Sequence, residues 1–216
     1  MNQPLILMPS SRGIDSVSPL SYLLTKRIIF LQGEVDDEVS TNIITQLKSL
    51  ELQDQNDDID LYINSPGGSV SNGLAIYDTI QSLHCKTNTY CIGSCASIAA
   101  ILFISATGKR YMQDNSTLMI HSPFLVTGGN SRKTPSEIEQ DGILLRKDQD
   151  KLFKIISESS DHTIEEITEK FSYGDSYFTP EEAISYGLCD EVIKPQHNNK
   201  RRLRNGKTKK PSSVSG

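Results

Sequence analysis

The stretch YCIGSCASIAA, residues 90–100, decides how the chain is interpreted. Tyr90 to Ile92 favour a strand, small residues follow, and the alanines after Ser97 favour a helix. Ser97 is therefore expected where a strand and a sharp turn give way to a helix. The first amides of a helix have no partner within it, so the Ile98 amide and the helix dipole can stabilise negative charge beside the Ser97 hydroxyl.

A second unit of the same kind precedes this one. Residues 59–63 alternate as a strand, the segment NSPGG at 64–68 breaks it, and residues 74–83 carry apolar side chains at helical spacing. Gly67 and Gly68 have no Cβ, so their backbone amides can come close to a substrate carbonyl. An ordinary turn is the alternative interpretation of these glycines.

Two further residues complete a candidate nucleophilic site. His121 ends the apolar run 118–121, which places its ring at the edge of a sheet, and Asp175 precedes a well-marked helix. A serine becomes a nucleophile when an imidazole takes its proton and a carboxylate orients that imidazole. His84, His162 and His197 lack such a setting. The order Ser, His, Asp and the absence of a G-x-S-x-G elbow separate the chain from the α/β-hydrolases.

The remaining pattern alternates strand-like runs with helical ones, which predicts an α/β domain with helices covering a sheet. Expected strands are residues 28–31, 86–92 and 188–193, with 111–112 and 118–121 as a pair across the polar turn 113–116. Expected helices are residues 39–52, 97–106, 136–158 and one that begins at the capping box 179–182 and ends at Gly187. The helix at 136–158 has a very polar middle, so we expect it to bridge to another surface.

Length and composition agree with one globular domain. The chain has 216 residues, of which 36% are hydrophobic and 23% charged. It has neither a signal-peptide pattern nor an apolar run long enough to span a membrane, which indicates a cytoplasmic protein. In that compartment the four cysteines are expected to be reduced thiols. Cys91 and Cys95 have the spacing of half a metal site, but no second pair follows, so neither metal nor cofactor is expected.

Charge is distributed unevenly. All 27 acidic residues lie before position 192, whereas residues 194–210 hold eight lysines and arginines. Such a tail could touch nucleic acid, but a solvated tail is the simpler interpretation, so nucleic acid is not an expected partner.

Several motifs together resemble one family. They are YINSPGG (62–68), AIYD (75–78), CAS (95–97), MIH (119–121) with Pro123, and TPEEA (179–183) before YGL (186–188). With this order and spacing, residues 11–193 resemble the Clp protease family, the ClpP-type proteolytic subunits. The resemblance implies a crotonase-like α/β fold of repeated strand-turn-helix units with a protruding handle helix. It also implies a serine endopeptidase that assembles as stacked seven-membered rings and degrades unfolded polypeptides delivered by an AAA+ Clp unfoldase.

The resemblance also assigns roles to residues. Ser97 would be the nucleophile, His121 the general base and Asp175 the orienting acid. The oxyanion amides would be those of Gly68 and Ile98. Substrate would be held along Gly67 and, by strand addition, along Phe124, Leu125 and Val126. Residues 1–18 would form an axial segment, 19–193 the peptidase domain with its handle at about 122–160, and 194–216 the basic tail.

The chain departs from the family pattern at several positions. Ser122 stands where a glutamine is usual, and residues 128–134 are an extra segment near the handle. Gly174 replaces the usual arginine before the aspartate, which in the family couples ring pairing to the active site. Two alternatives follow: a non-catalytic ring subunit in a mixed assembly with another ClpP-type subunit, and a crotonase-type enzyme acting on acyl-CoA thioesters.

Overall fold

The computed structural model describes residues 4–10, 13–125 and 132–195. Val126, His197 and almost all of the basic tail lie outside these residues. Within the described part of the chain, no helix is long and apolar enough to cross a membrane.

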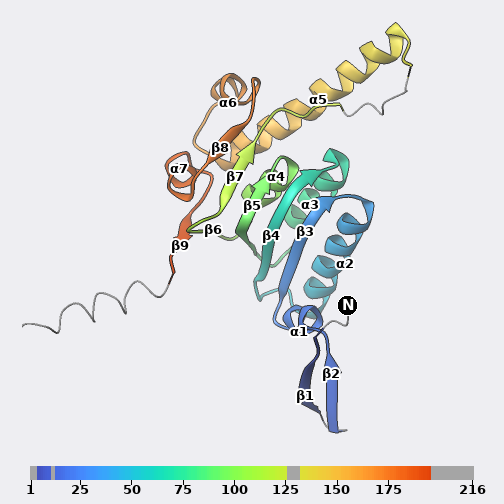
Figure 1. Cartoon of the computed structure of the whole chain (residues 1–216), viewed down its shortest axis with the longest axis vertical. Helices are drawn as coiled ribbons and strands as arrows, with labels where there is room; N and C mark the ends of the chain where they lie inside the picture. Colours follow the sequence, from blue (N-terminus) through green and yellow to red (C-terminus); the bar gives the residue numbers. More distant parts are fainter. Residues whose placement is uncertain (1–3, 11–12, 126–131, 196–216) are drawn as a thin grey trace, which may run out of the picture.

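Strands and helices alternate along most of the chain (Figure 1). The strands are β1 (Ile6–Ser10), β2 (Gly13–Val17), β3 (Ile28–Val35), β4 (Ile59–Gly68), β5 (Thr87–Ala96), β6 (Arg110–Gln113), β7 (Thr117–Ile120), β8 (Ser176–Phe178) and β9 (Glu191–Ile193). The helices are α1 (Pro19–Leu24), α2 (Asp37–Gln53), α3 (Val70–Ser82), α4 (Ile98–Ile104), α5 (Pro135–Ser159), α6 (Ile164–Phe171) and α7 (Pro180–Ser185).

A seven-stranded, mostly parallel sheet forms the centre. Strands β3, β4, β5, β6 and β9 follow one another in parallel, β7 also pairs with β5 in parallel, and β8 is antiparallel to β7. The hairpin of β1 and β2 projects from one end of the molecule, and α5 extends away from the other (Figure 1). The predicted α/β class with a protruding helix is confirmed, and the architecture is that of a crotonase-like fold.

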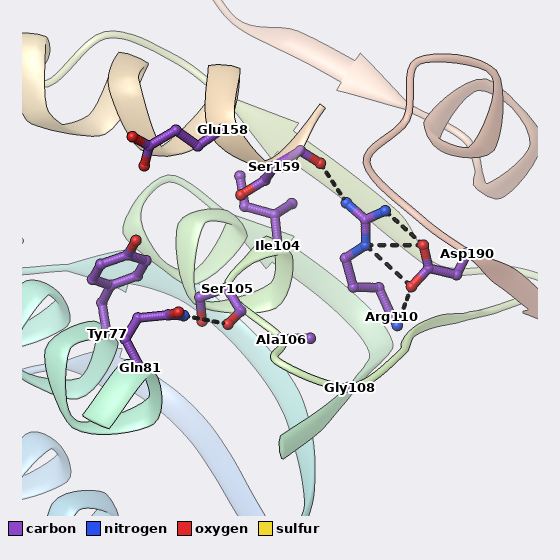
Figure 2. A pocket seen from close by; sticks show the side chains of 10 residues that line it. All are labelled: Tyr77, Gln81, Ile104, Ser105, Ala106, Gly108, Arg110, Glu158, Ser159 and Asp190. Carbon is purple, nitrogen blue, oxygen red and sulfur yellow. Dashed lines mark hydrogen bonds and ion pairs between the residues drawn. The ribbon is translucent and has the colours of Figure 1, made fainter. Parts of the chain in front are cut away.

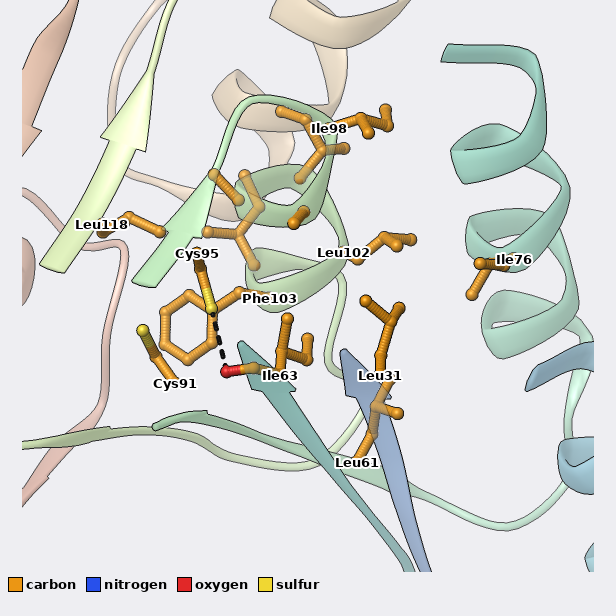
Figure 3. Close-up of a cluster of buried hydrophobic side chains, with 14 of the residues drawn as sticks. Leu31, Leu61, Ile63, Ile76, Cys91, Cys95, Ile98, Leu102, Phe103 and Leu118 are labelled. Atoms are coloured by element: carbon orange, nitrogen blue, oxygen red, sulfur yellow. Dashed lines mark hydrogen bonds between the residues drawn. The ribbon is translucent and has the colours of Figure 1, made fainter. Parts of the chain in front are cut away.

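One face of the sheet and the helices over it form the core. Leu31, Leu61 and Ile63 are fully buried, and helix α4 lies over them with every residue from Ile98 to Ile104 buried (Figure 3). Alternate residues of a strand point to opposite faces, so this pattern places one row of side chains toward the helices. Helix α4, apolar all round, is consequently the central element of the core.

The opposite face carries a row of aromatic rings. Phe30, Tyr62, Tyr90 and Tyr111 are register partners on β3 to β6, and successive ring centroids lie 5.2, 4.3 and 4.8 Å apart. All four side chains remain partly exposed. No helix of the described residues covers this row, so it is available to another surface.

The expected breaks at residues 64–68 and near Gly93 were placed wrongly. Strand β4 continues to Gly68 and β5 to Ala96, and the register shifts between Gln32 and Glu34 and between Ile63 and Ser65. The chain bends there by β-bulges rather than by turns. The strands therefore run further toward Ser97 than their propensities indicate.

The expected strand pair across residues 113–116 was also wrong. Strands β6 and β7 both exist, but each pairs in parallel with β5, at Thr89–Cys91 and at Ser94–Ala96. Strands β6 and β7 lie end to end beside β5. The polar segment between them carries the chain along β5 without reversing its direction. Strand β8 intervenes between Asp175 and α7, and the sequence analysis missed it together with α6 and the N-terminal hairpin.

The long polar helix was predicted correctly. Helix α5 begins at a capping box formed by Thr134 and Glu137. Its buried residues, Leu152, Phe153, Ile155 and Ile156, all lie in the C-terminal half. Toward the other end, Ile138 is 60% exposed, and Asp141 pairs with Lys133 just before the helix. The N-terminal half therefore buries no residue among those described.

Arg110 ties the end of α5 to the last strand. Its guanidinium pairs with Asp190 at 2.6 Å and donates to the Ser159 carbonyl at 2.8 Å (Figure 2). It also donates to the Gly187 carbonyl at 2.8 Å. The surrounding cavity of about 340 Å³ is polar, and these carbonyls and the carboxylate already engage the guanidinium. We interpret this cluster as a structural clamp.

The four cysteines are free and buried. The Cys95 thiol donates to the Ile63 carbonyl at 3.6 Å (Figure 3). The neighbouring Cys95 thiol lowers the pKa of Cys91, whereas burial raises the pKa of Cys95. Cys95 therefore remains a neutral thiol packed beneath the start of α4.

Glu51 generates a prediction on stability. Its nearly buried carboxylate accepts from the His84 backbone N–H at 2.9 Å and from Lys48 Nζ at 3.1 Å, and its pKa is lowered to about 2, chiefly by the His84 backbone bond. We expect Glu51→Gln to lower the free energy of unfolding at pH 7 by about 1 kcal/mol. Because the folded pKa is depressed, this difference should shrink as pH falls from about 4.5 toward 2. Urea titrations across that range measure it, and a constant difference would contradict it.

Candidate active site

Ser97 connects β5 to α4 in an unusual backbone conformation. Its φ of 57° and ψ of −128° lie where side chains rarely occur, and its hydroxyl caps no helix amide. Such a conformation costs about 1 to 3 kcal/mol and persists only where neighbours impose it. Here the Ser97 N–H donates to the Met119 carbonyl at 2.9 Å, continuing the pairing of β5 with β7. The hydroxyl is thus presented at the helix start without a structural bond to hold it.

The two glycines pack closely on neighbouring backbone, Gly67 on this turn and Gly68 on β3. A Cβ built on Gly67 would be 2.7 Å from the Ser97 Cβ and 3.2 Å from the Ile98 amide nitrogen. A Cβ on Gly68 would be 2.6 Å from the Val35 carbonyl oxygen. Both glycines have positive φ, so the sequence expectation of a close backbone approach applies at both positions. Gly67 and the first amide of α4 consequently lie beside Ser97, with Gly68 next along the strand.

His121 follows β7 and reaches the same place. Ser97 and His121 line one narrow cavity of about 20 Å³, whose other walls are apolar. These walls are Val70, Ile98, Ile101, Ile120, Pro123, Leu152, Phe153 and Ile156. The residues come from α3, α4, β7 and α5, so the cavity depends on the tertiary packing of all four elements.

Asp175 is brought to His121 by strand pairing. In the antiparallel pair of β7 and β8, Ile120 lies opposite Ser176. Continuing this register by one residue places His121 opposite Asp175, at a distance that side chains in a sheet can span. Strand β8, which the sequence analysis missed, is therefore what brings the carboxylate to the histidine.

Ser97 and His121 share a cavity, and the strand register extends from Ile120 toward Asp175, but among the described residues no hydrogen bond joins the three side chains. His121 Nδ1 lies 2.5 Å from the carbonyl oxygen of Ser122, and the ring stacks on Phe124 at 5.2 Å. The exposed Asp175 accepts from the Tyr177 hydroxyl at 3.3 Å. Within the described ranges, no hydrogen bond joins His121 to Ser97 or to Asp175. The nitrogen that a carboxylate would orient is thus turned toward its own neighbouring peptide.

The expected substrate segment is only partly described. Phe124 is 68% and Leu125 47% exposed, directly after His121, while Val126 lies outside the described residues. Two exposed apolar side chains beside the cavity offer surface to a bound chain.

The comparison with protein families decides the relationship. The family model described as Clp protease matches residues 11–196, which is most of the chain. The chain belongs to the Clp protease family. As a family member it is a peptidase of the ClpP type. The matched range includes Gly67, Gly68, Ser97, His121 and Asp175.

Two polar residues beside the candidate site were given no role from the sequence. Asn64 and Ser65 lie in the motif YINSPGG, just before Gly67 and Gly68. Ser65 is 1% exposed with its hydroxyl bonded on both sides, and Asn64 accepts from the Ser94 backbone amide. The only feature of the sequence that points to a role for them is that two polar residues directly follow an alternating strand pattern.

A metal site requires several ligand side chains close together. Among the described residues, no group of three or more histidine, cysteine, aspartate or glutamate side chains could hold a metal ion.

The close contact at Gly67 predicts the effect of a methyl group. We expect Gly67→Ala to lower the free energy of unfolding by about 1 to 3 kcal/mol, because the backbone of the Ser97 turn must shift. Gly142→Ala is the matched control: its Cβ meets nothing within 4 Å on α5, so we expect a gain of about 0.5 to 1 kcal/mol. Chemical denaturation measures both, and equal effects of the two variants would contradict the contact.

Proposed function

We propose that this peptidase is a serine endopeptidase in which Ser97 is the nucleophile, His121 the general base and Asp175 the orienting acid. The observation that carries the proposal is the strained backbone of Ser97 at the first turn of α4, in one cavity with His121. A nucleophilic serine needs an exposed hydroxyl, a base and nearby amides, and each is present around this residue.

The reaction follows from this arrangement. Ser97 Oγ attacks the peptide carbonyl carbon while His121 Nε2 takes the hydroxyl proton, and the negative carbonyl oxygen is held by the amides of Gly68 and Ile98. The C–N bond then breaks, and His121 returns its proton to the leaving amine. Water, deprotonated by His121, attacks the acyl ester, and His121 returns this proton to Ser97 Oγ as the ester bond breaks and the second product leaves.

One rearrangement is required before this reaction. His121 Nδ1 must leave the Ser122 carbonyl and donate to Asp175, which must turn from Tyr177. Both changes are side-chain rotations at the end of a two-strand pair and leave the register intact. We propose that contacts made in the assembled protein favour the rotated state.

Assembly is supported by the exposed half of α5. Ile138, Ile143 and Leu144 are between 43% and 60% exposed on a helix that extends from the body (Figure 1). Apolar side chains so placed are suited to packing on another subunit. We propose seven-membered rings, stacked through this region, built from this chain alone or with another ClpP-type subunit. Gly174, where the family usually has arginine, has a φ of 83° that favours glycine, so ring pairing would use other contacts.

A second surface suits further protein partners. The aromatic row of Phe30, Tyr62, Tyr90 and Tyr111 is partly exposed, and aromatic side chains are enriched in protein interfaces. We propose that an AAA+ Clp unfoldase delivers unfolded chains to the assembled rings.

Active-site labelling separates this function from its alternatives. We expect a fluorophosphonate to add to Ser97 in the assembled protein, and labelling and peptide hydrolysis to fall at least about 1,000-fold in Ser97→Ala and His121→Ala with assembly unchanged. Peptide mapping of the adduct and native mass measurement report both. An assembled ring that takes no label would favour a structural subunit, and acyl-CoA turnover retained in Ser97→Ala would favour a crotonase-type enzyme.

The walls of the cavity predict substrate preference. Because they are apolar, we expect kcat/KM to be at least about tenfold higher for peptides with leucine or methionine before the cleaved bond than for matched peptides with aspartate. The cavity holds only about 20 Å³, so side chains such as that of Phe153 must shift to admit a substrate group. Competition assays with paired peptides measure the ratio, and a preference for aspartate would contradict it.

A further inference from the structure

Three neighbouring strands fall out of register at the same level. The β3–β4 register shifts between Gln32 and Glu34, and the β4–β5 register shifts between Ile63 and Ser65. A bulge removes ladder partners from the backbone groups beside it. Since buried backbone groups need hydrogen bonds, something other than the ladder must supply them here.

The Ser65 hydroxyl supplies two of these bonds. It donates to the Gly33 carbonyl at 2.5 Å and accepts from the Gly67 backbone N–H at 3.1 Å. The side chain is 1% exposed, so water does not replace either bond. One hydroxyl therefore joins the bulge of β3 to the peptide that enters Gly67.

The contacts continue from Gly67 to the nucleophile. The Gly67 Cα lies so close to the Ser97 turn that an added Cβ would come within 2.7 Å of the Ser97 Cβ. From the other side, Asn64 Oδ1 accepts from the Ser94 N–H at 3.2 Å and holds the bulge of β5 that leads to Ser97. A change in the direction of the Gly67 N–H would rotate the following peptide, which carries the Gly68 amide.

We propose that Ser65 is a positioning residue that orients the Gly67–Gly68 backbone so that the Gly68 amide points at the oxyanion. Ser65 acts through the two glycines and does not touch the substrate. The proposal rests on the proposed function for its effect on catalysis, but its structural part does not.

A matched control exists at the far end of α4. Ser105 is 2% exposed and its hydroxyl donates to the Leu102 carbonyl at 2.6 Å, so it is about as buried as Ser65 and also donates to a backbone carbonyl, at the opposite end of α4 from Ser97. Ser105→Ala therefore reports the general effect of losing a buried serine hydroxyl.

The first measurement is hydrogen exchange of the full-length protein, resolved to single amides by mass spectrometry. In Ser65→Ala we expect the Gly67 amide to exchange about tenfold faster, since it loses its acceptor, while the Ser97 amide, bonded to Met119, is unchanged. Unchanged exchange at Gly67 would overturn the proposal, whether or not the protein is a peptidase.

The second measurement is peptide hydrolysis by the same variants. In Ser65→Ala we expect kcat to fall about 10- to 100-fold with KM within about twofold, because a displaced oxyanion donor weakens transition-state binding and not substrate binding. Ser65→Thr, which keeps the hydroxyl, should recover most of kcat, and Ser105→Ala should retain the wild-type value.

The outcomes separate the two claims. Faster exchange at Gly67 with wild-type kcat would overturn the link between Ser65 and the oxyanion, as would a kcat loss equal to that of Ser105→Ala. A wild-type protein that neither cleaves peptides nor takes a fluorophosphonate would refute the proposed function, while the exchange measurement would still decide the positioning of Gly67.

Discussion

The abrupt change from strand to helix at Ser97 is the constraint on which the rest of the structure depends. Strand β5 continues into the pairing with β7 up to the bond between the Ser97 N–H and the Met119 carbonyl, and the next residue already begins α4. Ser97 makes that change with a positive φ, which non-glycine residues rarely adopt, so the neighbouring elements must impose it. The buried α4, Gly67 of β4 and strand β7 all contact this turn.

The same constraint explains why the site needs residues far apart in the sequence. Position 67 must be glycine because a side chain there would collide with the Ser97 turn, and position 68 because a side chain would collide with Val35 of β3. Strand β7 must pair with β5 to bond Ser97, and this pairing carries His121 to the cavity. Strand β8 must then pair with β7 to bring Asp175 opposite His121. Each step uses backbone pairing, so the proposed site depends on the order of strands in the sheet.

The sequence was sufficient where local patterns decide the structure. Helices α2, α3, α5 and α7 follow from apolar spacing and from capping residues such as Thr179, whose box forms as expected. The glycine unit and the helix start at Ser97 were also recognisable, because few other environments need such residues. These patterns were enough to single out Gly67, Gly68 and Ser97 as candidate site residues without any tertiary information.

The remainder depends on contacts that a local pattern does not record. The segment at residues 64–68 has the composition of a turn, yet pairing with two neighbours keeps it in the sheet as a bulged strand. The polar segment between β6 and β7 has the composition of a hairpin turn, but β5 offers both strands a parallel partner. The bond of His121 to Ser122 depends on a side-chain rotation, which no pattern in the sequence indicates.

A structure of the assembled protein with a peptide boronate bound would test the central claim most directly. The account predicts a bond from boron to Ser97 Oγ, a boronate oxygen within hydrogen-bond distance of the Gly68 and Ile98 amides, and His121 Nδ1 turned from Ser122 to Asp175. A boronate bound elsewhere, or one bonded to Ser97 with its oxygen directed away from both amides, would contradict it.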